Sequence, residues 1–78
     1  MIFDKENLIK EIIDFRNTLT SDIEKSQEKF DRISIRIYIL NTFFGLNFKN
    51  ICYECDFDNP KRCRPYYARG HKLWLRLF

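Results

Sequence analysis

The sequence predicts a small α+β domain, in which an N-terminal helix packs on an antiparallel sheet and a zinc ion holds a C-terminal loop. Three observations predict this fold class. Apolar residues recur at helical spacing over residues 4–31, isoleucines alternate over 33–40, and all three cysteines and the only histidine fall within 51–74. With 78 residues, the chain is long enough for one domain with one core, spanning 1–78. So small a core leaves little stability, which favours an additional staple.

The N-terminal helix is predicted over residues 4–31. Its apolar side chains recur at steps of three and four residues, which places them on one face of a helix; they include Leu8, Ile12, Phe15 and Leu19. Asp4 is a suitable N-cap, because its carboxylate can accept a hydrogen bond from the first turn. Ser21 and Glu24 have the spacing of a capping box, so a break near 18–21 into two helices is an open alternative.

The sheet is predicted to contain three antiparallel strands, over residues 33–40, 46–53 and 72–78. The first strand has four isoleucines at alternate positions, which places them on one of its faces. Gly45 supplies a turn before the second strand, because glycine tolerates positive φ. Helical steps also relate Ile33, Ile37 and Leu40, so a mainly α-helical hairpin followed by the zinc loop is the alternative fold. The composition of residues 56–71 favours a loop.

The cysteines and the histidine have the spacing of ligands to a structural zinc ion. Cys52 and Cys55 form a C-x2-C pair. Cys63 follows after seven residues, and His71 after seven more. Three thiolates and one imidazole form a closed tetrahedral set, which is typical of structural zinc. Such a site contributes on the order of 10 kcal/mol to folding, and Gly70 would relieve the turn into the last strand.

Other interpretations of this cluster remain open. The cysteines can be small hydrophobic core residues with His71 in solvent, or thiols with redox or iron–sulfur chemistry. Over residues 52–71 the ligand spacing resembles that of zinc ribbons and treble-clef knuckles, but the second C-x2-C of those folds is missing, so the resemblance implies no function. No H-E-x-x-H motif and no phosphate-binding glycine loop is present. We therefore predict no enzymatic activity.

Residues 60–76 are predicted to form a loop that binds a partner, because basic and aromatic side chains alternate there. The predicted contacts are Lys61, Arg62, Arg64, Tyr66, Tyr67, Arg69, Lys72 and Arg76. Cationic groups neutralise phosphates and aromatic rings stack on unpaired bases, so RNA or single-stranded DNA is the predicted partner. The same residues would suit an acidic protein surface. The chain is thus predicted to be a non-enzymatic, zinc-stabilised binding module.

The charge distribution supports a second hypothesis. Residues 1–31 carry eight acidic and five basic side chains, whereas residues 56–78 carry two acidic and six basic ones. The acidic N-terminal helix could imitate a nucleic acid. The alternative function is therefore an inhibitor or adaptor, of the kind that phages and mobile elements make, which binds a nucleic-acid-processing protein and occludes its site through this helix or through the basic loop. A homodimer through the N-terminal helix is also open. Without a secretory signal or an apolar run of about 20 residues, we expect a cytoplasmic protein that does not enter a membrane.

Overall fold

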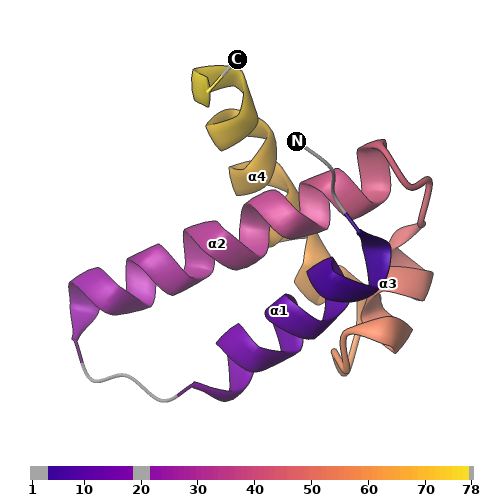
Figure 1. Ribbon diagram of the computed structural model, residues 1–78, viewed down its shortest axis with the longest axis horizontal. Coiled ribbons are helices and arrows are strands. Elements are labelled where there is room, and N and C mark those ends of the chain that lie inside the picture. The colour runs from indigo at the N-terminus through magenta and orange to yellow at the C-terminus, as the bar shows by residue number, and fades with distance from the viewer. Residues whose placement is uncertain (1–3, 19–21, 78) are drawn as a thin grey trace.

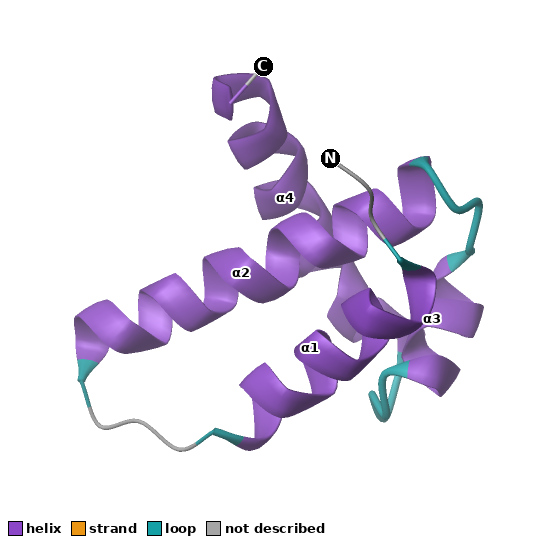
Figure 2. Ribbon diagram, in the orientation of Figure 1, coloured by secondary structure: helices purple, strands orange, loops and turns teal. Residues whose placement is uncertain are grey.

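The computed structural model describes residues 4–18 and 22–77, and all regular secondary structure in these residues is helical (Figure 2). The elements are α1 (Lys5–Asn17), α2 (Ile23–Thr42), α3 (Phe48–Glu54), the short 3-10 helix η1 (Pro60–Arg62) and α4 (Cys63–Leu77). Because no strand occurs in this part of the chain, the predicted α+β fold with an antiparallel sheet is wrong. Residues 33–40 lie within α2, most of 46–53 forms α3, and 72–77 belong to α4.

The longest helix, α2, is the centre of the arrangement. It packs against α1 on one side and against α4 on the other (Figure 1). The C-terminal turns of α4 extend beyond α2 on the side away from α1, while α3 and η1 pack together near the beginning of α4. Residues from every α-helix form one hydrophobic core, together with the turn after α3; its fully or almost fully buried members include Leu8, Ile12, Ile33, Ile37, Leu40, Ile51, Cys55 and Cys63.

The helix ends explain why the predicted helix over 4–31 is two helices. Asp4 caps α1, as predicted, because its carboxylate accepts a hydrogen bond of 3.0 Å from the backbone N–H of Glu6. The helix ends at Asn17, and α2 begins after its own N-cap, Asp22, which accepts from Glu24 at 2.8 Å. The open alternative, two helices with a break near 18–21, therefore describes the structure, and one continuous helix over 4–31 does not. The capping role of Ser21 lies outside the described residues.

The second helix forms where a strand was predicted because it is buried along two of its faces. Ile33, Ile37 and Leu40 follow helical steps and are at most 1% exposed. Ser34 and Tyr38 lie one position further round the helix and are also buried, against α4. A helix that packs between two other helices needs two apolar stripes. Because these stripes are offset by one residue, apolar side chains occupy adjacent positions, and the helical period is harder to recognise in the sequence. Burial therefore outweighs the strand preference of the isoleucines.

A close backbone contact sets the crossing of α2 and α4. A Cβ atom built on Gly70 would lie 2.2 Å from the backbone oxygen of Ser34 and 2.8 Å from the Cβ of Tyr38. The Ser34 hydroxyl turns back to donate to the carbonyl oxygen of Phe30, at 2.6 Å. Gly70 is therefore needed inside a helix, because the absence of a side chain lets the backbones of α2 and α4 touch. The role predicted for it, relief of a turn into a strand, is wrong.

The loop predicted over residues 56–71 is mostly helical, and the positions of its two prolines explain the difference. Pro60 occupies the first turn of η1 and Pro65 the first turn of α4. Neither position has to donate an intrahelical hydrogen bond, so proline is tolerated at both. Gly45, in contrast, does have the positive φ predicted for it, 71°.

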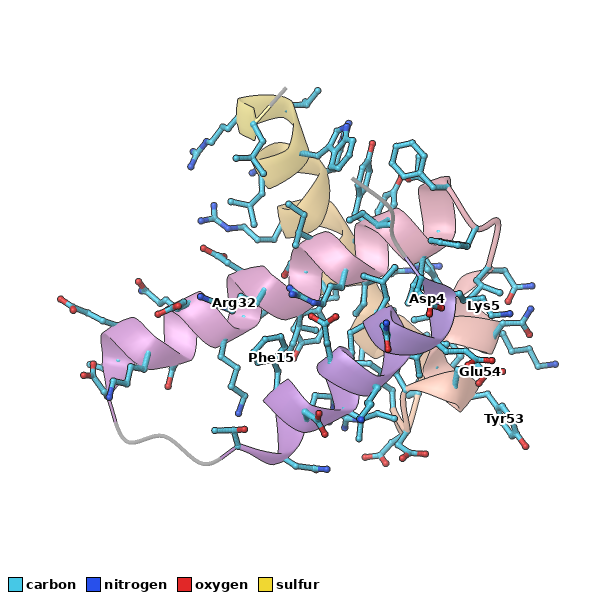
Figure 3. The ribbon with its side chains drawn as sticks, viewed as in Figure 1. Asp4, Lys5, Phe15, Arg32, Tyr53 and Glu54 are labelled. Carbon is cyan, nitrogen blue, oxygen red and sulfur yellow. The ribbon has the colours of Figure 1, made fainter. Side chains whose placement is uncertain are left out.

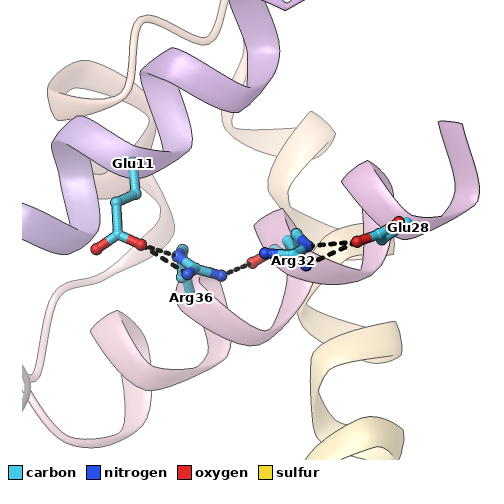
Figure 4. A network of polar contacts seen from close by, with 4 residues as sticks. All are labelled: Glu11, Glu28, Arg32 and Arg36. Atoms are coloured by element: carbon cyan, nitrogen blue, oxygen red, sulfur yellow. Dashed lines mark hydrogen bonds and ion pairs between the residues drawn. The ribbon is translucent and has the colours of Figure 1, made fainter. Parts of the chain in front are cut away.

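Polar contacts join α1 to α2. The Arg36 guanidinium donates two hydrogen bonds to the Glu11 carboxylate, at 2.6 and 2.9 Å, and a third to the Arg32 carbonyl oxygen (Figure 4). Arg32 in turn pairs with Glu28, one turn earlier on α2. Phe15 lies on the side of α1 that faces α2 (Figure 3), with the Arg36 guanidinium 4.9 Å from its ring centroid. These contacts supplement the apolar packing between the two helices.

Candidate nucleic-acid interface

The three cysteines lie in the corner where α3, the following turn and α4 meet. Cys52 is on α3, Cys55 is the C-cap of that helix, and Cys63 begins α4. All three are buried and belong to the hydrophobic core. The Cys52 thiol donates a hydrogen bond of 2.8 Å to the carbonyl oxygen of Phe57.

Burial keeps two of these thiols protonated. It raises the pKa of Cys55 to about 12, with a smaller contribution from the neighbouring Cys63. Burial also raises the pKa of Cys63 to about 11, and the proximity of Cys52 adds to this effect. The guanidinium of Arg16 acts in the opposite direction on both thiols but does not cancel the burial effect. A neutral thiol is a poor nucleophile, so this environment gives no support to redox or nucleophilic chemistry.

His71, the fourth predicted zinc ligand, lies apart from the first turn of α4. It follows Cys63 by eight helical residues, which corresponds to about 12 Å along the axis. Its exposed ring stacks on Tyr38, with centroids 5.5 Å apart, and lies 6.4 Å from the ring of Tyr67. Over residues 4–18 and 22–77, no three Cys, His, Asp or Glu side chains are grouped in a way that could hold a metal ion. The zinc site of Cys52, Cys55, Cys63 and His71 stays a prediction, which metal analysis would test.

Basic side chains dominate the surface of η1 and α4. Residues 60–77 contain no Asp or Glu. Arg64, Ala68, Lys72 and Arg76 follow one another at four-residue steps along α4, and all four are exposed. We call these four residues the basic row. Lys61 and Arg62, in η1, are exposed next to its N-terminal end.

The backbone contact at Gly70 determines which way the basic row faces. Ala68 and Lys72 each lie two residues from Gly70, or about 200° round the helix. Because Gly70 touches α2, these two side chains point away from α2. Ala68 and Lys72, with Arg64 one turn before them, are therefore on the outer surface of α4, where a partner can reach them. Arg76, at the C-terminal end of the row, instead borders a groove against α2 that Glu24 and Glu28 also line.

Two of the predicted partner-binding residues are already paired within the protein. Arg69 donates to both carboxylate oxygens of Asp31, at 2.8 and 3.2 Å, and this hydrogen bonding raises the pKa of Arg69. Arg62 lies 3.9 Å from the Asp58 carboxylate. In the described residues, no carboxylate lies within ion-pair distance of the other four; they are Lys61, Arg64, Lys72 and Arg76.

The aromatic rings near the basic row pack inside the fold. Tyr66 is 4.7 Å from Phe30 and 5.6 Å from Phe57, measured between ring centroids. Tyr67 is 5.5 Å from Tyr38 and 5.4 Å from Phe48. Both tyrosines are only half-buried, but these neighbours cover much of their rings. Sequence reasoning thus found the cations, whereas the tyrosines contribute mainly to packing.

One residue that positions the candidate interface was not found in the sequence. The Arg16 guanidinium on α1 donates to the carbonyl oxygens of Cys55 and Asp56, at 2.6 and 2.7 Å, and lies 4.0 Å above the ring of Phe57. It thereby holds the turn that leads into η1 and α4. Nothing in the sequence distinguishes Arg16 from the other charged residues of α1, because its partners are 39 and 40 positions away.

Comparison of the chain with protein-family models, curated proteins and solved structures gave no match. Among the described residues, no helix combines the length and the apolar character needed to cross a bilayer.

Proposed function

We propose that the protein is a non-enzymatic nucleic-acid-binding module and that the basic row of α4 is its contact surface. The observation that carries this proposal is the row itself. Three exposed cations follow one another along one helix, two of them on its outer side, in a segment without Asp or Glu, and none of the three has a carboxylate within ion-pair distance in the described residues. Such cations gain free energy by displacing the counterions that surround nucleic-acid phosphates.

The spacing of the cations suits a polyanion better than a single acidic group. Arg64 and Arg76 are 12 residues apart, which corresponds to about 18 Å along the helix. A ligand that contacts the whole row must therefore carry negative charge over a similar distance, as a phosphate backbone does. Lys61 extends this charge beyond the N-terminal end of the row.

Binding to a mixture of short DNA and RNA oligonucleotides, measured by fluorescence anisotropy at increasing salt, tests the proposal. The double variant Arg64→Ala, Lys72→Ala removes two cations from the row. We expect it to weaken binding at least about tenfold and to reduce the slope of log affinity against log salt by about 2. The matched control is Lys10→Ala, Lys25→Ala, which removes two exposed lysines from α1 and α2.

The control variant should bind as the parent does, although its net charge equals that of the test variant. Equal losses in the two variants would mean that net charge, and not α4, drives binding. No binding by the parent at low salt would overturn the proposal and favour the alternative partner, an acidic protein surface. That outcome would restore the hypothesis of an inhibitor or adaptor directed at a protein.

A further inference from the structure

We infer that the ligand of the basic row is double-stranded DNA in the B form, and that α4 enters its major groove. This inference rests on the function proposed above and narrows it to one class of nucleic acid. The single-stranded nucleic acid expected from the sequence required aromatic rings that bases could stack on. The described rings near the row instead pack against other rings of the fold.

The shape of α4 supports insertion into a groove. It is a helix of 15 residues, and an α-helix with its side chains is about 10–12 Å wide, close to the width of about 12 Å of the B-form major groove. The C-terminal turns of α4 extend beyond α2 (Figure 1), so one end of the helix protrudes from the rest of the fold. In A-form RNA the major groove is deep and narrow, and side chains cannot read it.

The order of residues in the basic row also fits a groove. Ala68 lies between Arg64 and Lys72, one turn from each, and all three are exposed. A small side chain at the centre lets the helix axis approach the base edges, while the long side chains on both sides reach phosphates at the groove edges or acceptor atoms of guanine. Arg69, which pairs with Asp31, lies to the side of the row and contributes to the position of α4 on α2.

Three ligands of the same sequence and length separate this inference from the function on which it rests: a DNA duplex, an RNA duplex and the single DNA strand. We expect the DNA duplex to bind at least about tenfold more tightly than either of the other two. Equal or tighter binding of the RNA duplex or the single strand would overturn the inference while the proposed function stands. Absence of binding to all three would overturn both.

A modified duplex tests the groove itself. In DNA that contains glucosylated 5-hydroxymethylcytosine, a neutral sugar fills the major groove and leaves the backbone charge unchanged. We expect this duplex to bind about tenfold more weakly than the unmodified one. Equal affinity for the two duplexes would show that α4 contacts only the backbone and would overturn the placement in the groove.

The substitution Ala68→Glu adds a carboxylate at the centre of the basic row. It should weaken binding to the DNA duplex at least about tenfold, because the new charge would face the bases and phosphates. Asn7→Asp, at an exposed position of α1, makes the same change of charge away from the basic row and should leave affinity unchanged. Circular dichroism of both variants confirms that the helices remain folded. An unchanged affinity in folded Ala68→Glu would overturn the inference.

Discussion

The two sides of α2 are built differently. On the α4 side, the backbone of Gly70 lies directly against the backbone of Ser34, with no space for a Cβ atom. On the α1 side, side chains fill the interface: Ile12 is fully buried, and Arg36 reaches across to Glu11. Side chains can change rotamer to absorb an alteration, whereas two touching backbones cannot.

This difference bears on function, because the stricter interface is the one that orients the basic row. Ala68 and Lys72 face outward as a consequence of the contact two residues away, at Gly70. A small change at the crossing would rotate or displace the whole of α4. A change of one side chain between α1 and α2 would lower stability but leave the crossing of α2 and α4 in place.

The largest effect is expected for Gly70→Ala. Alanine favours a helix over glycine by about 1 kcal/mol, but its Cβ would have to displace the backbone of α2. We expect the free energy of unfolding to fall by about 3 kcal/mol, the upper end of the cost of overpacking. Urea denaturation followed by circular dichroism measures this change.

Ala68→Gly is the control for this experiment, because it changes helix propensity on the exposed side of the same helix. Its expected cost is about 1 kcal/mol. A Gly70→Ala variant that is as stable as the parent would show that the backbones of α2 and α4 leave space for a Cβ atom, which would contradict the close contact described above.

The next largest effect concerns the corner where α3 meets α4. If Cys55 is only a buried apolar side chain, Cys55→Ala should lower the free energy of unfolding by about 1–2 kcal/mol, with no change in metal content. The zinc hypothesis predicts instead about one zinc ion per chain in the parent, its loss from the variant, and a fall in stability on the order of 10 kcal/mol. Elemental analysis and denaturation of both proteins decide between the two.

A smaller effect is expected on the α1 side of α2. Ile12→Val removes one methylene from a side chain that is 0% exposed. The expected loss is about 1 kcal/mol, because neighbouring side chains can close part of the space. Thermal denaturation of Ile12→Val beside Gly70→Ala compares one carbon removed with one carbon added. A loss for Ile12→Val as large as that for Gly70→Ala would contradict the distinction between the two interfaces.

The smallest effects belong to the ion pairs in Figure 4. The Arg36 and Glu11 side chains are 19% and 43% exposed, whereas those of Arg32 and Glu28 are 52% and 58% exposed. A double-mutant cycle should give a coupling energy of about 1 kcal/mol for the first pair and about 0.3–0.5 kcal/mol for the second. Equal coupling energies for the two pairs would mean that partial burial does not strengthen the ion pair between Arg36 and Glu11.

The elements predicted correctly depend on interactions between near neighbours in the chain. Asp4 caps a helix because the N–H group it binds is two residues away, and Gly45 adopts positive φ because of its own lack of a side chain. The stripe of Leu8 and Ile12 was found because α1 buries one face only. In each case the reason lies within a few residues.

The elements predicted wrongly depend on partners far away in the chain. The isoleucines of α2 alternate like those of a strand, and only the presence of helices on two sides makes a helix the better way to bury them. Gly70 and Pro65 indicate a loop by composition, yet Gly70 meets Ser34, which is 36 positions earlier. A local pattern cannot contain that information.

The sequence by itself determined which end of the chain is acidic and which is basic, and it determined the local features that start helices and form turns. The tertiary structure alone decided that most of the cations at the basic end lie on α4, that Arg64 and Lys72 share its outer side and that the tyrosines between them turn inward. The reason is geometric: the direction of each side chain on α4 follows from the face of that helix that touches α2, and this contact joins residues distant in sequence.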